Sequence, residues 1–265
     1  MKSPLFKCLC AQSPKEKVKL LENLCCLLSE FIGTGMLMFL GCMGCIESDL
    51  FESNNLTRSL NFGIVVLIII QCFGCCSGAH LNPAVTLASY IYNMLSLPMV
   101  AAYIVAQILG AICGYGLLKV FLPMDLIQVP GKSNALCLTA VHSSIATWQA
   151  VGIEMCITAT LVWVCCGVWD PRNKMFQDSV PIRFGLTVAS LSITAGPLTG
   201  ASMNPARSLA PAVWNNQLQD QWIYWIAPLL ASIISANFYK YVFKGEECKE
   251  EKPMTKMNEA QISCP

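Results

Sequence analysis

Long apolar runs separated by polar connections dominate this chain. Six of them approach or reach the roughly 20 apolar residues that a helix needs to cross a bilayer. The predicted spans are Leu24–Cys45, Leu60–Ser77, Pro98–Val120, Thr147–Trp169, Val180–Ala195 and Trp222–Phe243. The pattern therefore predicts an all-α membrane protein with six transmembrane helices.

Two further apolar segments, Leu81–Tyr92 and Met203–Trp214, are too short to cross a bilayer. Apolar segments of about 10–14 residues are typical of re-entrant or interfacial elements. An Asn-Pro pair stands at the start of each, and proline is well placed in the first turn of a helix. We therefore predict two re-entrant half-helices.

The composition agrees with a membrane protein. Hydrophobic residues make up 55% of the chain and charged residues only 12%, whereas a soluble domain has about 25% charged residues. No Asp, Glu, Lys or Arg occurs from Ser59 to Leu118. The net charge of +1 provides no basic stripe for phosphates, so a nucleic-acid partner is not expected.

An internal repeat relates the two halves of the chain. Glu30 and Glu154 lie at the start of the first and fourth apolar runs, and an Asn-Pro-Ala motif follows each glutamate. Asn82 comes 52 residues after Glu30, and Asn204 comes 50 residues after Glu154. Because each half contains three spans, the second copy must enter the membrane upside down. Inverted repeats of this kind place a solute site near the bilayer midplane.

The repeat divides the chain into a channel domain and two tails. The channel domain is expected at 21–243, with repeat one at 21–120 and repeat two at 147–243. The tails, 1–20 and 244–265, and the connection between spans four and five carry many of the basic residues. The positive-inside rule makes that side cytoplasmic, and we expect a multi-pass protein of the plasma membrane. Asn55 then begins an extracellular Asn-Leu-Thr glycosylation sequon.

Sixteen cysteines would suit a disulfide framework in a secreted protein. Most of these cysteines, Cys42 among them, lie inside apolar runs, so we interpret them as small packing residues. Two Cys-x-x-Cys pairs, at Cys42 and Cys72, have a metal-like spacing, but no histidine joins either pair. We expect no metal and no other cofactor.

The half-helices carry the chemistry of the proposed pore. The first N–H groups of a helix lack intrahelical partners, and a helix N-terminus carries about half a positive charge. Two such ends facing each other at mid-membrane repel cations. The side chains of Asn82 and Asn204 can donate hydrogen bonds to a passing molecule, which interrupts a proton-conducting chain of waters.

The two motifs resemble the constriction motifs of the aquaporin (major intrinsic protein) family. The sequences are SGAHLNPAVT, which contains Asn82, Pro83 and Ala84, and GASMNPARS, which contains Asn204, Pro205 and Ala206. The resemblance spans roughly 21–243. It implies an aquaporin-like hourglass fold in the lipid bilayer and a homotetramer with one pore in each subunit.

The resemblance also implies roles for single residues. Arg207 matches the arginine of the outer selectivity filter, and Glu30 and Glu154 match glutamates that support the re-entrant loops. His80 matches a pore-lining histidine, although a buried, hydrogen-bonded histidine is the simpler interpretation.

Gly110-x-x-x-Gly114 permits close helix contact. We interpret Gln107 and Pro228 as packing residues.

The remaining filter positions favour solutes larger than water. Phe62 matches the aromatic filter position, Ser192 stands where water-selective members have histidine, and Ala201 is small. A wider, amphipathic opening suits glycerol and urea together with water. The serine resembles the insect glycerol-transporting branch, the entomoglyceroporins. Ser208 and three residues downstream of it are those of water channels: Ala212, Tyr224 and Trp225.

We therefore expect a passive channel for glycerol, urea and water that excludes protons and ions. A strictly water-selective aquaporin is the first alternative. An ion-coupled secondary transporter is more remote, because only Glu30 and Glu154 could serve as coupling carboxylates. A structural role in adhesion has no use for an intact pore motif. No nucleophile–base pair or metal-ligand set suggests an enzyme.

Overall fold

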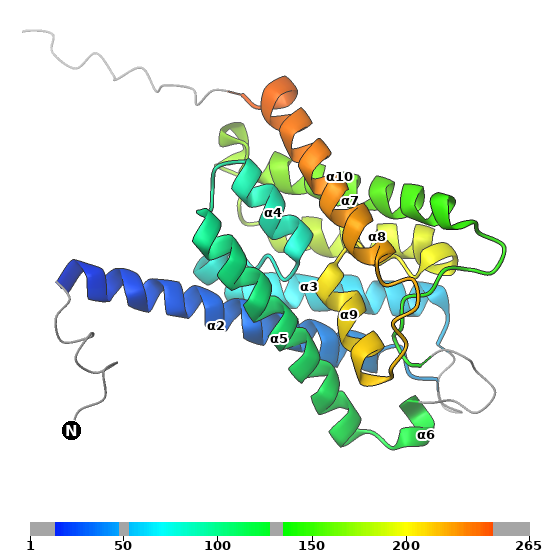
Figure 1. The fold of residues 1–265 in the computed structure, drawn as a ribbon. Helices are drawn as coiled ribbons and strands as arrows, with labels where there is room; N and C mark the ends of the chain where they lie inside the picture. Colours follow the sequence, from blue (N-terminus) through cyan, green and yellow to red (C-terminus); the bar gives the residue numbers. More distant parts are fainter. Residues whose placement is uncertain (1–13, 48–52, 128–134, 246–265) are drawn as a thin grey trace, which may run out of the picture.

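The structure is a computed structural model that describes residues 14–47, 53–127 and 135–245 (Figure 1). Residues 1–13 of the predicted N-terminal tail and 246–265 of the predicted C-terminal tail lie outside the described residues. The described residues form long helices with two short helices, α4 and α9, between them.

Each half of the chain contains the same succession of three long helices and one short helix. The first half has α2 (Pro14–Met43), α3 (Asn55–Ser77), α4 (Pro83–Ile91) and α5 (Leu97–Phe121). The second half has α7 (Thr147–Trp169), α8 (Val180–Thr199), α9 (Pro205–Trp214) and α10 (Ile223–Phe238). Three small elements complete the described chain: α6 (Met124–Ile127), η1 (Pro171–Asn173) and the π-helical turn η2 (Tyr239–Phe243).

The packing of the helices follows the inverted repeat. In the first half α2 packs on α5 and α3, and in the second half α7 packs on α10 and α8. The two halves meet where α3 packs along α8. Each short helix packs on the last long helix of the opposite half, so that α4 contacts α10 and α9 contacts α5. This exchange brings the N-termini of α4 and α9 together in the interior.

Several helix boundaries differ from those predicted, most clearly the starts of α2 and α3 and the end of α8. α2 begins at Pro14 instead of Leu24, because the Lys-, Glu- and Leu-rich leader consists of good helix formers. α3 begins at Asn55 instead of Leu60, because Asn54 and Thr57 form a capping box. In that box the Thr57 N–H donates to Asn54 Oδ1 and the Asn54 N–H donates to Thr57 Oγ1, both at 3.0 Å. α8 runs to Thr199 instead of Ala195.

Five helices in the described parts of the chain are long and apolar enough to cross a membrane. They are α2, α3, α5, α7 and α10 with its continuation η2. α8, the sixth predicted span, has 20 residues and is less apolar because it contains Arg183 and several serines and threonines. Its packing along α3 places it in the equivalent position of the second half. The protein is an all-α membrane protein.

The long helices direct large apolar side chains outward. Residues exposed by more than a third include Leu28, Ile64, Val105, Leu109, Leu186, Ile226 and Ile234. A soluble monomer rarely exposes apolar surface on this scale. A hydrocarbon environment accounts for it, since lipid tails solvate such side chains.

Close contact between α2 and α5 depends on glycine, as the Gly110-x-x-x-Gly114 spacing predicts. A Cβ atom on Gly110 would overlap the carbonyl of Phe31, and one on Gly114 would overlap the carbonyl of Gly35. The prediction of a close-packed glycine pair is confirmed. Small residues at such crossings allow the two backbones to approach.

Gly114→Ala should therefore destabilise the protein, because the added methyl group meets backbone and not a movable side chain. Overpacking of this kind costs about 1–3 kcal/mol. Gly152→Ala in α7 is the matched control, since a Cβ there meets nothing within 4 Å. It should instead stabilise the helix by about 0.5–1 kcal/mol. Thermal unfolding of the purified variants in detergent measures both effects, and shifts of equal sign would contradict the packing argument.

Candidate functional site

The N-termini of α4 and α9 are joined end to end by their asparagines. Asn82 Nδ2 donates to the carbonyl of Met203 at 2.9 Å, and Asn204 Nδ2 donates to the carbonyl of Leu81 at 2.8 Å. Each asparagine thus forms a hydrogen bond with the residue that precedes the other asparagine. A primary amide has two N–H donors, so each side chain keeps a second one for the cavity that both asparagines line.

The same asparagines cap their own helices. Asn82 Oδ1 accepts from the N–H of Ala84 at 2.8 Å, and Asn204 Oδ1 accepts from the N–H groups of Ala206 at 3.0 Å and Arg207 at 3.2 Å. The proline after each asparagine occupies the first helical position. It has no N–H to leave unpaired there. The Asn-Pro-Ala sequence therefore specifies both where a half-helix begins and which way its amide points.

The backbone before each asparagine takes the same unusual path in both halves. Ala79 and Leu81 have φ values of 46° and 57°, and Ala201 and Met203 have 45° and 52°. These are left-handed conformations, which cost a non-glycine residue of order 1–3 kcal/mol. The surrounding structure must therefore hold both loops in place.

Glu30 holds the first loop from inside the protein, where it is fully buried. Its Oε1 accepts from Ser77 Oγ at 2.7 Å and from the His80 N–H at 2.9 Å. Its Oε2 accepts from the Leu81 N–H and from Gln107 Nε2, both at 2.8 Å. Four donors thus converge on one carboxylate.

Glu154, also fully buried, repeats the arrangement in the second half. Its Oε1 accepts from Thr199 Oγ1 at 2.6 Å and from the Ser202 N–H at 2.9 Å. Its Oε2 accepts from the Met203 N–H at 2.9 Å. Among the described residues three donors therefore converge on Glu154, one fewer than on Glu30.

Gln107 is the fourth donor to Glu30, and Glu154 has no counterpart of it among the described residues. The interpretation of Gln107 as a packing residue is wrong. Its amide nitrogen bridges Glu30 and Thr86 Oγ1, each at 2.8 Å. Gln107 therefore belongs to the polar network under the first loop. Pro228, at the comparable place of the second half, is buried in α10 and has no polar side-chain atom to offer.

Two tyrosines complete the supports and were not identified from the sequence. Tyr103 Oη donates to the carbonyl of Ser77 at 3.1 Å, and Tyr224 Oη donates to the carbonyl of Thr199 at 2.8 Å. Both therefore fix the last residue of a long helix where the re-entrant loop begins. Their repeat spacing, 21 residues after Asn82 and 20 after the second asparagine, is the signal that could have revealed them.

A continuous cavity of about 1000 Å³ passes through the site. Its lining extends from Glu47 and Arg58, before and in the first turn of α3, to Gln177 and Asp178, before α8. Eight of the predicted site residues line it: Asn55, Phe62, His80, Asn82, Ser192, Ala201, Asn204 and Arg207. The lining, as drawn from the described residues, does not include Glu30 or Glu154. The arrangement is that of a lumen with both asparagines on its wall.

The predicted filter residues lie together on this wall. The Arg207 guanidinium carbon lies 4.9 Å from the centre of the Phe62 ring. Arg207 Nη1 donates to the carbonyl of Cys137 at 2.7 Å. Ser192 and Ala201 line the same cavity with small side chains. Phe62 and Arg207 thus form a contact between an aromatic face and a fixed cation, and Ser192 and Ala201 add two small side chains to the lining of the same cavity.

His80 fits both descriptions that the sequence allowed. Its ring lines the cavity, and its Nδ1 lies 3.2 Å from Thr86 Oγ1 within hydrogen-bonding distance. The ring also lies 5.4 Å from that of Tyr103 and 6.1 Å from that of Trp169, measured between centroids. It is therefore a hydrogen-bonded side chain of the lumen wall.

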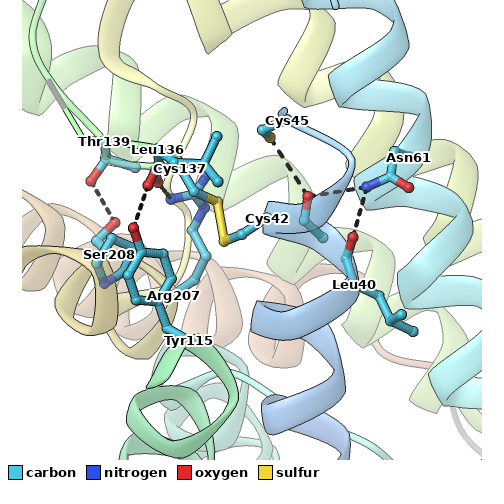
Figure 2. Close-up of a disulfide and its surroundings, with 12 residues drawn as sticks. Leu40, Cys42, Cys45, Asn61, Tyr115, Leu136, Cys137, Thr139, Arg207 and Ser208 are labelled. Carbon is cyan, nitrogen blue, oxygen red and sulfur yellow. Dashed lines mark hydrogen bonds between the residues drawn. A yellow bond between two sulfur atoms is a disulfide. The ribbon is translucent and has the colours of Figure 1, made fainter. Parts of the chain in front are cut away.

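The interpretation of Cys42 as a packing residue is wrong. Cys42, in the last turn of α2, forms a disulfide with Cys137, 95 residues away in the loop before α7 (Figure 2). Cys45 of the same Cys-x-x-Cys pair is a free thiol. No local pattern reveals a bridge of this span. Cys165 and Cys166 of α7 are free and buried, as the packing interpretation predicts. That interpretation is wrong for five other cysteines of the apolar runs, which are exposed on the outside of the described protein: Cys25, Cys72, Cys75, Cys113 and Cys156.

Asn55, the predicted glycosylation residue, is the first residue of α3 and lines the mouth of the cavity. Its Nδ2 donates to the carbonyl of Ile193 in α8 at 2.9 Å. A glycan would replace one of the two hydrogens on this nitrogen, so only the other could then donate to Ile193.

Comparisons with known proteins agree with this geometry. A family model described as major intrinsic protein matches residues 17–239. Aquaporin-4 of Bos taurus is 37% identical over 185 residues, 70% of this chain and 55% of that protein. Aquaporin-2 of Rattus norvegicus is 34% identical over 81% of this chain and 77% of that protein. The X-ray structure of the aquaglyceroporin from Plasmodium falciparum is 26% identical, with a TM-score of 0.70 over 83% of this chain and 96% of that chain.

The opposed half-helices, the inverted repeat and the continuous lumen define a membrane protein with the aquaporin fold. The chain belongs to the major intrinsic protein family, which is a family of channels and not of enzymes. The match spans about half the length of the aquaporin-4 relatives.

Replacement of the two glutamates by glutamine should separate their contributions. In Glu30→Gln an NH2 group replaces one of the two carboxylate oxygens. Each oxygen accepts from two donors, so the NH2 group must face two of the four donors in either orientation. In Glu154→Gln the NH2 group can replace Oε2, which accepts from the Met203 N–H alone among the described donors. Each stranded buried donor costs about 1–3 kcal/mol. Glu30→Gln should therefore lower the apparent unfolding temperature more than Glu154→Gln.

Thermal unfolding in detergent measures this order, and Glu22→Gln on the exposed part of α2 is the control for loss of a charge. Equal shifts for Glu30→Gln and Glu154→Gln would contradict the donor count.

Proposed function

We propose that the protein is a passive channel that conducts water together with glycerol and urea and excludes protons and ions. The observation that carries the proposal is the lumen itself. It passes the cross-bonded asparagines of two opposed helix N-termini and then a guanidinium beside an aromatic ring.

Ion exclusion follows from the charges along this path. Each half-helix presents about half a positive charge at its N-terminus, and Arg207 adds a full one. A cation that sheds water to enter the lumen meets these positive charges beside both asparagines and at Arg207. The free N–H of each asparagine orients a passing water as an acceptor, which breaks the chain that would relay a proton.

The two glutamates do not favour an ion-coupled transporter. Such a mechanism needs a carboxylate in contact with the substrate or the coupling ion. Glu30 and Glu154 are fully buried and face loop donors. They act as supports of the loops that present Asn82 and Asn204.

Ser192 supports the larger solutes. A serine in the lumen that Phe62 and Arg207 also line leaves space that an imidazole would fill, and Ala201 adds to that space. A polyol can place its carbon chain along the Phe62 ring and its hydroxyl groups toward Arg207. Urea can accept hydrogen bonds from the same guanidinium. This filter is the basis of the likeness to the glycerol-transporting branch of the family.

A strictly water-selective channel is the second candidate, because several of the similar proteins carry aquaporin-2 and aquaporin-4 names. Ser208 belongs to the water-channel pattern, but it gives this candidate little support because its side chain does not face the solute path. Its hydroxyl lies 2.9 Å from Thr139 Oγ1 and 2.5 Å from Ser202 Oγ, and it does not belong to the described lining of the lumen.

The proposal includes the setting of the channel. The apolar outer faces of the long helices suit a lipid bilayer, and we propose the plasma membrane with both termini cytoplasmic. A homotetramer with one lumen in each subunit is the proposed assembly. The function requires no cofactor, metal or nucleic acid.

Ser192→His should narrow the filter, because the larger ring reaches toward Phe62 and Arg207. Glycerol flux should fall by about tenfold or more, equivalent to ~1.4 kcal/mol of added barrier, while water flux is retained. Uptake of labelled glycerol and osmotic swelling in oocytes that express equal surface amounts measure the two fluxes.

Ser192→Ala is the matched control, since it keeps the small volume and removes only the hydroxyl, and it should keep most of the glycerol flux. Unchanged glycerol flux in Ser192→His would remove the filter argument. A wild-type protein that swells in dilute medium but takes up no glycerol or urea would establish the water-selective alternative.

A further inference from the structure

The loop before α7 crosses the outer end of the lumen, and the disulfide ties it to α2. Residues 135–138 of this loop line the cavity, including Cys137. Cys137 is bonded through sulfur to Cys42 and through its carbonyl oxygen to Arg207 Nη1 (Figure 2). One residue is therefore joined covalently to α2 and, through a hydrogen bond, to the proposed filter cation.

We propose that the Cys42–Cys137 disulfide is a positioning element of the outer filter. It holds the carbonyl of Cys137 in place, and that carbonyl fixes the direction of the Arg207 guanidinium beside Phe62. This inference rests on the proposed role of Arg207 in the filter. If it holds, reducing agents that break the disulfide change the position of Arg207 and therefore the flux through the filter.

The backbone of Cys137 needs such a restraint. Its φ is 66°, in the left-handed region that side chains other than glycine rarely adopt. The flanking residues are also held, because Tyr115 Oη donates to the carbonyl of Leu136 at 2.8 Å and Thr139 Oγ1 lies 2.9 Å from Ser208 Oγ. The disulfide is the covalent restraint on Cys137 itself.

The other end of the disulfide is anchored in a rigid part of the molecule. Cys42 is fully buried. Asn61 Nδ2, from α3, donates to the carbonyls of Leu40 at 3.3 Å and Gly41 at 3.1 Å in the same turn of α2 (Figure 2). Asn61 precedes Phe62, so the aromatic face of the filter and the anchor of the disulfide are fixed to each other.

Loss of the disulfide should release the guanidinium. The hydrogen bond from Arg207 to Cys137 is charge-assisted, and such bonds are the stronger ones in proteins. When the carbonyl leaves, the guanidinium turns toward other acceptors, and water and solute in the lumen are the nearest ones. A cation that spends time across the path obstructs every solute that passes the filter.

Reduction provides a test on protein that has already folded. One molecule of dithiothreitol breaks the S–S bond, transfers two electrons and two protons to give the thiols of Cys42 and Cys137, and closes into its own cyclic disulfide. The loop lies at the mouth that we assign to the extracellular side, where disulfides persist.

The experiment compares osmotic water flux and glycerol flux in proteoliposomes before and after dithiothreitol. After dithiothreitol, water flux through the wild type should fall by about threefold or more, and glycerol flux should fall in parallel. Reoxidation should restore both fluxes. Cys42→Ser should have the low flux from the outset and not respond to the reagent. Cys113→Ser, which removes an exposed free thiol from α5, should behave as wild type does.

A second variant tests whether the effect passes through the filter cation. In Arg207→Val no guanidinium remains to be released, so dithiothreitol should leave its water flux unchanged. An equal loss in wild type and Arg207→Val would show that the disulfide merely stabilises the fold, and would overturn the proposal. So would a Cys42→Ser channel with wild-type flux. Because water flux is the main measurement, a wild type that conducts water but not glycerol refutes the proposed solute and still tests the disulfide.

Discussion

The reciprocal hydrogen bonds between two asparagine amides and the opposite loop carbonyls are the interaction on which this structure depends. Asn82 and Asn204 each cap one half-helix and bond the residue that precedes the other asparagine. The bonds can form only if both half-helices enter the protein from opposite sides and stop at the same depth. That requirement explains the inverted repeat, the strained loops before each asparagine and the buried carboxylates that hold those loops. Irregular backbone at this depth is tolerated because it is buried in protein or faces a lumen.

Much of this was predictable from the sequence because the signals are local. Proline in the first helical turn fixes the starts of the half-helices at Pro83 and Pro205, within two residues of the predicted segments. The hydropathy pattern predicted the long helices, and their ends differ where a cap such as Asn54 or a charged helical leader extends them. The resemblance to the aquaporin family indicated which carboxylates face the loops, and the residues expected at the filter do line one cavity.

The rest depends on contacts between residues far apart in the sequence. Cys42 and Cys137 are separated by 95 positions, and nothing in the local pattern of either distinguishes a bonded cysteine from a packing one. Gln107 looked like a packing residue in an apolar helix, yet its amide reaches Glu30, 77 positions away. The asymmetry between the two carboxylates follows from this one side chain. Such differences between the halves are invisible to a repeat analysis, which detects only what the halves share.

The central claim is that two opposed helix ends and their asparagines admit uncharged molecules in single file and repel ions. The most direct test is to measure ionic current across planar bilayers and osmotic water flux in vesicles with the same purified protein. The account predicts rapid water flux with no current above that of protein-free membranes, for protons and for alkali cations alike. A protein-dependent ionic current without a matching flux of neutral molecules would contradict it.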